Sequence, residues 1–411
     1  MRRRHEGTKA RRHEGGEGKK ARRGTKGRRG GMSERIKVCF VFGTRPEAIK
    51  VAPVIAHLSS QDAFQVVTVL TAQHREMLDQ VVEVFDIPVT HDLNVMQPAQ
   101  SLASLTSVLS ELIGAVLDAE QPDCVMVQGD TTSCFVGALA AFYGQIPVAH
   151  LEAGLRTDDV CQPFPEEMNR RLVAPLASFH FAPTEQARAN LLKENIVGDR
   201  IWVTGNSGID ALRIISERKD IRPRGALADV LRRCTGQVVT VTTHRRENIP
   251  FMNGIASAIC ELVRAASDVD VVFPVHLSPK VRDAVMPILE GQERCHLLDP
   301  LAYDQFVTLM RRSDILLTDS GGIQEEAPYL GKPVLVMRRK TERPEGLAAG
   351  TLKLVGERRD SIVEATMRLL NDRDECQRMA RATNPYGDGH TSERVGMILR
   401  EQLSRLSASG S

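Results

Sequence analysis

Eleven apolar runs of strand length recur along the chain. Most are near-continuous stretches of Val, Ile and Leu, as in IKVCFVF, rather than alternations of apolar and polar residues. A strand of that kind has both faces buried, which is typical of parallel sheets covered by helices. The predicted strands span residues 36–42, 65–72, 124–130, 146–154, 179–184, 201–205, 237–244, 269–276, 295–300, 315–320 and 333–338.

Helical patterns fill the gaps between these runs at βαβ spacing, for example at residues 101–119, 254–267 and 361–382. Residues 206–236 are poor in strand signal and contain RPRG, which places a hinge near residues 205–210. We therefore predict an α/β fold with two Rossmann-like domains that face a central cleft. The predicted segments are a disordered basic tail (1–31), an N-terminal domain (32–205), a C-terminal domain (206–380) and a helical stretch that returns to the N-terminal domain (381–411).

Composition narrows the class of protein. The 411 residues suffice for two domains with buried cores, and 42% apolar with 26% charged residues are typical of a soluble globular protein. No run approaches the roughly 18 consecutive apolar residues of a membrane span. The eight cysteines show no CxxC pair and no metal-ligand spacing, which indicates a reduced, cytoplasmic protein without a metal.

The first 31 residues differ in charge from the rest of the chain. They hold 13 Lys and Arg against three Glu, a net charge of +10, while the remainder has a net charge of −8. This tail repeats RRHEG, lacks large apolar residues after Met1 and has no apolar segment of the kind found in signal peptides. One interpretation is a nucleic-acid-binding arm. We favour the other, an upstream extension before a native start at Met32.

Polar motifs follow the predicted strands of the first domain, at the edge where open α/β sheets bind ligands. FGTRPEAIK brings Arg45 and Lys50 to a helix start, which favours an anion site over a solvated basic turn. GDTTS, HLEAG and PEEMNRRL supply Asp130, Glu152 and Glu166. Taken singly, these carboxylates are a helix cap, a salt-bridge partner and a helix-end charge. Three at successive strand ends would instead converge on one cleft and perturb one another's pKa values.

The second domain carries basic and glycine-rich motifs at its strand ends. THRREN contains His244 and Arg245, for which the alternative is a basic surface loop, and PVHLS contains His276. Neither histidine has a metal-ligand partner at helical spacing. DSGGIQEE pairs Gly321 and Gly322 at a helix start, as in a phosphate-binding turn, although two glutamates follow within one turn.

Taken together, these motifs resemble those of the non-hydrolysing UDP-N-acetylglucosamine 2-epimerases, from about residue 35 to residue 403. In chain order the motifs are FGTRPEAIK, TAQHREMLDQV, GDTTS, HLEAGLRT, PEEMNRRL, THRREN, DSGGIQEEAPYLGKPVLVMR, TERPE and NPYGDG. The resemblance implies a GT-B fold, a homodimer, and no metal or redox cofactor. It also implies an isomerase that converts UDP-N-acetylglucosamine reversibly to UDP-N-acetylmannosamine for cell-surface polysaccharide precursors.

The implied mechanism is an anti elimination of UDP, which leaves a 2-acetamidoglucal, followed by re-addition of UDP with a proton delivered to the other face of C2. Two acid/base groups and a clamp on the leaving diphosphate suit this chemistry. By resemblance, Asp130, Glu152 and Glu166 are the acid/base candidates, and His244 supports the chemistry and contacts the diphosphate. The substrate-binding positions implied are Arg45, Lys50, Asp130, Glu152, His244, Leu301, Phe306, Ser320, Gly321, Gly322, Glu326 and Arg343.

Within that set, the resemblance places Phe306 near the uracil, and Glu326 suits the ribose hydroxyls. Glu325 has no assigned role and is expected to face solvent. Bacterial relatives are activated by a second UDP-N-acetylglucosamine, and the matching positions are Gln73, Arg245 and His276.

The chain also departs from the family pattern. Gln128 replaces a common His and is expected to alter the surroundings of Asp130. Leu301 replaces a common Gln, so that only a backbone contact to uracil would survive. The loop after THRREN is about one residue short, which puts its phosphate contacts in doubt.

Other functions fit less of the sequence. A related GT-B glycosyltransferase has no use for a proton-transfer cluster opposite the nucleotide. An epimerase acting on a diacetamido UDP-sugar is a further alternative, and a hydrolysing 2-epimerase would differ by releasing free UDP and N-acetylmannosamine. A nucleic-acid-binding protein that uses the basic tail would leave the carboxylates without a purpose, and nucleic acid and membrane are therefore not expected partners.

Overall fold

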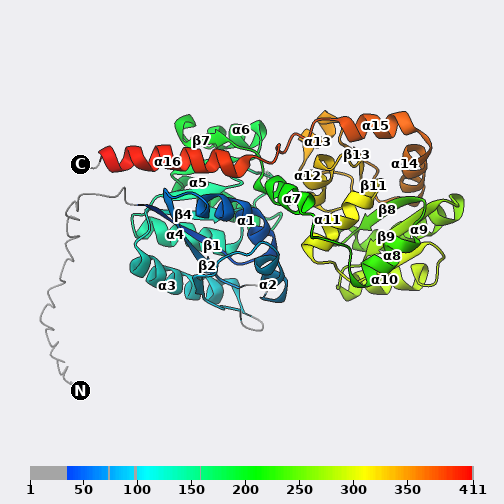
Figure 1. Cartoon of the computed structure of the whole chain (residues 1–411), viewed down its shortest axis with the longest axis horizontal. Helices are drawn as coiled ribbons and strands as arrows, with labels where there is room; N and C mark the ends of the chain where they lie inside the picture. The colour runs from blue at the N-terminus through cyan, green and yellow to red at the C-terminus, as the bar shows by residue number, and fades with distance from the viewer. Residues whose placement is uncertain (1–34, 73–74, 97–99, 158, 410–411) are drawn as a thin grey trace, which may run out of the picture. The chain divides into compact units, whose positions relative to one another are not determined.

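The computed structural model describes residues 35–72, 75–96, 100–157 and 159–409 (Figure 1). The predicted tail, the predicted start at Met32 and the candidate Gln73 lie outside the described residues.

Seven parallel strands form the first sheet. They are β1 (Ile36–Phe42), β2 (Phe64–Leu70), β3 (His91–Asp92), β4 (Cys124–Gln128), β5 (Val148–Leu151), β6 (Phe179–Ala182) and β7 (Ile201–Val203). Their order across the sheet is β3-β2-β1-β4-β5-β6-β7, and each neighbouring pair is parallel.

Six parallel strands form the second sheet. They are β8 (Gln237–Thr242), β9 (Val269–Pro274), β10 (Cys295–Leu298), β11 (Ile315–Thr318), β12 (Val334–Val336) and β13 (Leu352–Leu354). Their order is β10-β9-β8-β11-β12-β13, again with parallel pairs throughout. Two parallel sheets with helices between successive strands confirm the predicted α/β fold with two Rossmann-like sheets.

Helices connect the strands in βαβ order. Those of the first sheet are α1 (Arg45–Ser59), α2 (Arg75–Val84), α3 (Leu102–Glu120), α4 (Thr132–Tyr143), α5 (Glu166–Leu176) and α6 (Glu185–Lys193). The later helices are α7 (Ser207–Glu217), α8 (Gly225–Arg233), α9 (Met252–Ala265), α10 (Pro279–Leu289), α11 (Tyr303–Arg312), α12 (Gly321–Tyr329), α13 (Pro344–Ala349), α14 (Arg359–Asn371), α15 (Arg373–Arg381) and α16 (Thr391–Ser409).

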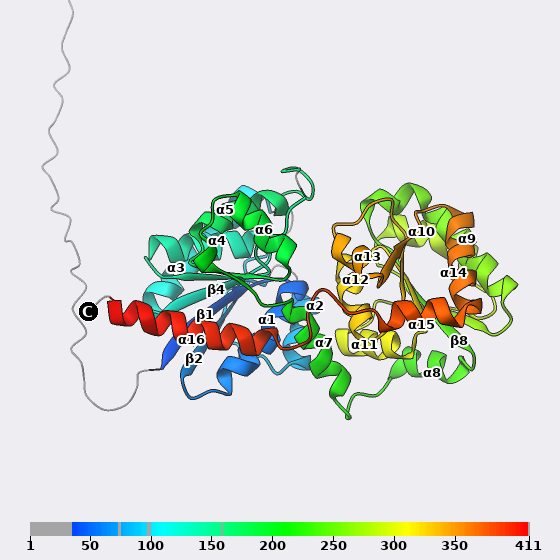
Figure 2. The same cartoon turned by 90° about the horizontal axis from the view of Figure 1, so that it is seen from above.

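Alternation along β1 explains why both faces of the first sheet are covered. Phe40 and Phe42 belong to one buried cluster with α1 and α16, whereas Cys39 and Val41 belong to another with α3 and α4. Successive side chains of a strand point to opposite faces, so a continuous apolar run needs helices on both. Figure 2 shows α3, α4 and α5 on one side of this sheet and α1, α2 and α16 on the other.

The helix α3 is long and strongly apolar. Of the helices in the described residues, only α3 is long and apolar enough to cross a membrane by length and composition. Its buried residues recur every fourth position, at Leu105, Leu109, Ile113 and Leu117, and they pack in a cluster with α4. A single buried stripe is typical of a surface helix in a globular protein.

The helices α7 and α16 follow the two predicted domain boundaries, at residues 205–206 and 380–381. The helix α7 packs against α1, α11, α12 and α16, so it touches helices of both sheets. The last helix, α16, packs against α1 (Figures 1 and 2). The division into domains at residues 205–206 and 380–381 stays a prediction.

Candidate active site

The candidate residues follow the carboxyl ends of parallel strands. Asp130 comes two residues after β4, Glu152 directly after β5, His244 two residues after β8, and Ser320 two residues after β11. Because all strands of a sheet run the same way, these side chains are gathered at one edge of their own sheet, as predicted.

Glu152 is the most contacted of the candidate carboxylates. It pairs with the Lys50 ammonium, accepts a hydrogen bond from Gln128, and accepts another from Asn206 Nδ2 at 3.3 Å. Gln128 thus serves Glu152 and not Asp130, contrary to our expectation. Burial alone would raise the pKa of Glu152, but Lys50, together with Arg343 and Arg170, outweighs burial and holds the pKa below the ordinary value. The carboxylate is therefore ionised and available as a base.

The backbone at Glu152 is also unusual. Its φ is 62°, in the left-handed region that a residue with a side chain adopts at a cost of about 1–3 kcal/mol. Strain of this kind is concentrated at functional sites, where the surrounding structure enforces it.

Asp130 is held by an arginine and does not cap a helix. Arg170 contacts its carboxylate at 2.6 Å, and Asn169 donates to its backbone carbonyl at 2.8 Å. The N-cap of α4 is Thr131, whose hydroxyl accepts from Cys134 N. The simple capping interpretation of Asp130 is therefore wrong.

Glu166 and its neighbour Glu167 have different surroundings. Glu167 is fully buried and pairs with Arg170 at 2.9 Å and Arg171 at 3.2 Å, so the helical ion pairs expected of this segment belong to Glu167. Glu166 stands at the first position of α5, and among the described residues its buried Oε2 has no hydrogen-bond partner. A buried carboxylate oxygen without a partner is suited to meet a ligand.

Two arginines surround the start of α12 in the second sheet. A β-carbon placed on Gly321 would lie 3.4 Å from Arg245 Nη2 and 3.5 Å from Arg343 Nη2. The N-cap Ser320 makes no side-chain capping bond, so the first N–H groups of α12 are not capped by its hydroxyl. A helix N-terminus beside two guanidinium groups is an anion site.

His244 is positioned by a buried aspartate that the sequence did not single out. Asp319, fully buried, accepts from the backbone N of His244 at 3.1 Å, from Arg245 N at 3.0 Å and from Asn248 at 3.0 Å. Burial lowers the pKa of His244, and Asp319 opposes that shift. The ring of His244 stacks on His276 with centroids 5.7 Å apart. A charged residue directly after a buried strand was the signal for Asp319.

The two glutamates of DSGGIQEE differ in their burial and in their partners. Glu325 is buried, pairs with Arg343 and accepts from Asn206 Nδ2 at 2.7 Å, so the expectation that it faces solvent is wrong. Burial raises the pKa of Glu325, while Arg343 and Lys50 oppose the shift. Glu326 is half-buried, and burial together with Glu325 raises its pKa to about 8.

Asn206 brings the two sets of residues together. Its amide donates both to Glu152, after β5 of the first sheet, and to Glu325, on α12 beside the second sheet. Lys50, Glu152, Asn206, Glu325 and Arg343 therefore form one continuous polar network. Asn206 could not be identified from the sequence, because its partners are 54 and 119 residues away.

The remaining candidates lie around this network. Arg45 donates to the backbone carbonyl of Leu301 at 3.3 Å, so the Leu301 backbone already has a polar contact. Phe306 is half-buried on α11 and packs against the large core cluster. Arg245 forms an ion pair with Glu342 at 3.3 Å.

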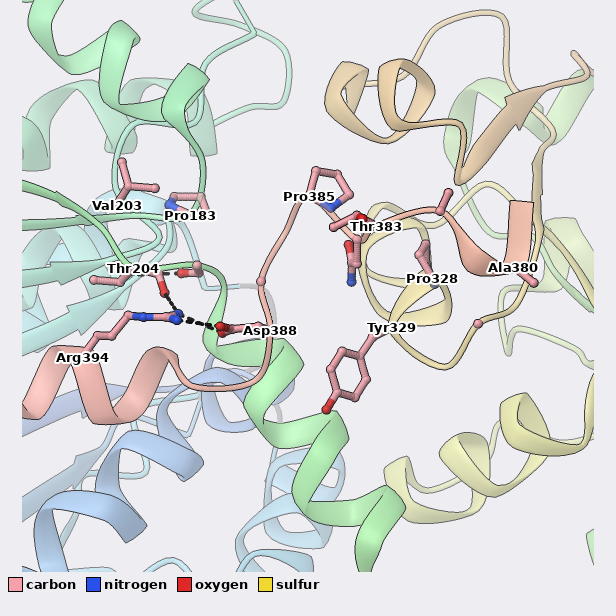
Figure 3. Close-up of a pocket in the computed structure, with 15 residues that line it drawn as sticks. Pro183, Val203, Thr204, Pro328, Tyr329, Ala380, Thr383, Pro385, Asp388 and Arg394 are labelled. Atoms are coloured by element: carbon pink, nitrogen blue, oxygen red, sulfur yellow. Dashed lines mark hydrogen bonds and ion pairs between the residues drawn. The ribbon is translucent and has the colours of Figure 1, made fainter. Parts of the chain in front are cut away.

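The cavity drawn in Figure 3 is separate from the candidate residues. It has a volume of about 620 Å³, and its lining, which includes Tyr329, Asp388 and Arg394, contains none of the predicted site residues. Arg394 holds Asp388 at 2.6 Å and donates to the Thr204 carbonyl at 3.1 Å, which fixes the start of α16 against the end of the first sheet.

The chain is similar in sequence to known proteins over most of its length. Residues 56–400 match the family model described as UDP-N-acetylglucosamine 2-epimerase. A UDP-N-acetylglucosamine 2-epimerase of Yersinia pestis is 49% identical over 378 residues, which covers 90% of this chain and 100% of that protein. The protein of that name from Escherichia coli is 48% identical over 379 residues, with the same coverage of both chains.

A solved structure is similar as well. The crystal structure of the UDP-GlcNAc 2-epimerase from Neisseria meningitidis bound to UDP-GlcNAc superposes with a TM-score of 0.82 at 46% sequence identity. The match covers 89% of this chain and 100% of that chain.

Proposed function

Because this chain belongs to the UDP-N-acetylglucosamine 2-epimerase family, we propose that it is a non-hydrolysing enzyme that interconverts UDP-N-acetylglucosamine and UDP-N-acetylmannosamine. The GT-B fold expected from the sequence agrees with the solved epimerase structures. The Neisseria meningitidis relative binds UDP-GlcNAc, which supports a UDP-sugar substrate here.

The observation that carries the proposal is the polar network across the two sheets. It joins an ionised carboxylate, Glu152, to Arg343 at an anion-binding helix start through Asn206 and Glu325. Proton transfer at C2 and departure of UDP from C1 need a base and an anion clamp within one sugar ring of each other. The network supports that pairing.

We assign roles within the site as follows. The N–H groups of Gly321 and Gly322, the hydroxyl of Ser320 and the guanidinium of Arg343 hold the diphosphate, with His244 beside them. Glu326 accepts from the ribose, and Phe306 and the Leu301 backbone receive the uracil. Arg45 and Lys50 balance the negative charge that the nucleotide brings.

The acid/base groups are Asp130, Glu152 and Glu166. One removes the C2 proton while the C1–O bond to UDP breaks, so that its electron pair leaves with UDP and a C1–C2 double bond forms. Return of UDP to C1 is then joined by proton delivery to the other face of C2. Arg170 forms an ion pair with Asp130, and Lys50 stabilises the ionised form of Glu152.

The wider setting is proposed by analogy with the family. We place the enzyme in the cytoplasm as a homodimer that supplies cell-surface polysaccharide precursors. Every cysteine in the described residues is free, which agrees with a reducing compartment. A second UDP-N-acetylglucosamine is the proposed activator, with Arg245 and His276 among its contacts; the stacking of His276 on His244 would link the two sites.

Incubation of the protein with UDP-N-acetylglucosamine alone in deuterated water tests the proposal. We expect deuterium at C2 of both UDP-sugars and an equilibrium mixture of the two epimers. Absence of C2 exchange under conditions where the UDP-sugar binds would overturn it in favour of a glycosyltransferase. Release of free UDP with N-acetylmannosamine would identify a hydrolysing enzyme instead.

A further inference from the structure

Three metal-ligating side chains meet in the second sheet, away from the candidate active site. They are Cys234, at the C-terminal end of α8, Asp270, the second residue of β9, and His296, the second residue of β10. The thiol sulfur, a carboxylate oxygen and an imidazole nitrogen all lie within 4.8 Å of one another. From this geometry we infer that the three residues bind a zinc ion.

The strand register explains how residues so far apart in sequence converge. Val272 is the register partner of His296 and lies two residues after Asp270. The side chains of Asp270, Val272 and His296 therefore stand on one face of the sheet. Cys234 packs in the small apolar cluster that covers this face, together with Val238 and Val272. Ligand spacing along the chain was uninformative because each ligand comes from a different element.

The location separates this cluster from the proposed chemistry. Asp270 and His296 lie at the amino ends of their strands, whereas His244 and His276 follow the carboxyl ends of β8 and β9. The two groups of residues are therefore at opposite edges of the same parallel sheet. An ion bound here would not take part in the proposed proton transfer.

The donor set selects the metal. A thiolate, an imidazole and a carboxylate are ligands of Zn²⁺, whereas Ca²⁺ and Mg²⁺ take oxygen ligands. The negative charges of Cys234 and Asp270 would match the two positive charges of the ion. Burial and the nearby Asp270 raise the pKa of the Cys234 thiol to about 11, with Arg312 and Arg233 opposing the shift, so binding would release the thiol proton to solvent.

The present distances are close to those of a zinc site. His296 Nε2 and Asp270 Oδ1 are 2.9 Å apart and share a hydrogen bond. Zinc bonds of about 2.0–2.3 Å in tetrahedral geometry set ligand atoms roughly 3.3–3.7 Å apart. The ion would take the place of the shared proton, and small side-chain rotations would bring the Cys234 sulfur into range.

A cavity gives the cluster access to solvent. It has a volume of about 660 Å³ and is lined by Asp270 and His296, together with Glu293 and Cys295. A water molecule can therefore complete the four ligands from the cavity side, as in zinc sites that have three protein ligands. Such an ion would tie α8 to β9 and β10.

The test uses the full chain, freed of metals with a chelator and then titrated with Co²⁺ or Zn²⁺ alone. We expect a thiolate-to-cobalt charge-transfer band that saturates at one ion per chain, and a rise in Tm on addition of Zn²⁺. Cys234→Ser should abolish the band and weaken zinc binding by more than about 100-fold, since loss of an outer-sphere partner alone costs 10–100-fold. Cys295→Ser is the matched control and should retain both signals.

Two results would overturn the assignment. One is the absence of a cobalt–thiolate band in the wild type, a result that does not depend on whether any variant folds. The other is an unchanged band in Cys234→Ser, which would mean that the thiolate ligand is a different cysteine and that the ion binds elsewhere. Epimerase activity of Cys234→Ser should equal that of the wild type, so this test is independent of the proposed function.

Discussion

At the scale of single residues, Glu166 and Glu167 provide a matched pair of substitutions. Glu166 has a buried oxygen without a hydrogen-bond partner among the described residues, whereas Glu167 is fully buried between Arg170 and Arg171. We expect Glu166→Gln to lower kcat by about 10²–10⁴-fold, the usual contribution of a general acid or base, with little effect on Tm. Glu167→Gln should instead destabilise the fold by about 3–5 kcal/mol, because it breaks a buried ion pair.

Deuterium exchange at C2 and thermal unfolding, measured on both variants, check this pair. Full activity of Glu166→Gln would remove Glu166 from the proposed acid/base set. An unchanged Tm of Glu167→Gln would mean that the Arg170 and Arg171 contacts add nothing to stability.

The candidate site shows how much of its structure could be predicted from the sequence. Asp130, Glu152, His244 and Gly321 were identifiable because each follows a buried strand, and the strand edge is where ligands bind. The partners that fix the charge and orientation of these residues could not be identified from the sequence. Asp319 and Glu325 lie in the same motif as Ser320, Gly321 and Gly322, and nothing in the motif sets them apart as partners of other residues. A contact such as that between Asn206 and Glu325 depends on the fold and not on sequence spacing.

At the scale of elements, the start of α12 makes a prediction of its own. Gly321→Ala places a methyl group against Arg245 and Arg343 at ordinary contact distances, so the fold should tolerate it. The methyl group would, however, occupy the space proposed for the diphosphate. We expect UDP affinity to fall by about 10–100-fold, equivalent to losing one charge-assisted hydrogen bond of about 1.5–3 kcal/mol. Calorimetric titration with UDP measures this loss.

Gly114→Ala, in open space on α3, is the control and should bind UDP as the wild type does. A Gly321→Ala variant with wild-type affinity and Tm would show that the nucleotide does not reach this helix start.

Two buried histidines in strands β5 and β6 make the stability of the fold depend on pH. His150 and His180 face each other in register, and burial lowers the pKa of His150 to about 4 and that of His180 to about 3. Both are neutral in the folded chain at pH values where the unfolded chain, with a pKa of about 6.5, binds protons. Stability is thus fully present above pH 6.5 and falls as the pH drops toward 4.

His180→Phe removes one of these groups and tests the account. Between pH 6.5 and 4.5 the variant should lose about 2 kcal/mol less stability than the wild type, since one pKa unit corresponds to about 1.4 kcal/mol. Urea unfolding across this range gives the comparison, and parallel curves for the two proteins would contradict it.

Elements were predictable where burial set the pattern and unpredictable where it did not. Every predicted strand forms, because a continuous apolar run has few alternatives between two helical layers. The strands β3 and β13 escaped notice, since two or three residues carry no periodicity. The predicted helix at 361–382 is divided into α14 and α15 at Asp372, whose side chain caps α15 by accepting from Glu375 N at 2.8 Å.

At the scale of the whole molecule, the amide of Asn206 couples the carboxylates that stand beside the two sheets. Its Oδ1 caps α7 by accepting from Gly208 N at 2.9 Å, while its Nδ2 donates to Glu152 and Glu325. Asn206→Asp keeps the cap but replaces the shared donor with a third carboxylate. We expect a loss of about 3 kcal/mol or more at pH 8, as for a buried charge left without a partner.

The loss should shrink on acidification, because protonation of any of the three carboxyl groups restores a donor between them. Asn206→Ser keeps a capping oxygen without adding charge and should cost only about 1–3 kcal/mol, the penalty for an unsatisfied buried polar group. Unfolding at pH 8 and pH 5 separates the two variants. If Asn206→Asp were as stable as Asn206→Ser at both pH values, Glu152 and Glu325 would not be negatively charged together, and Lys50 and Arg343 would have to be reassigned as free cations awaiting the nucleotide.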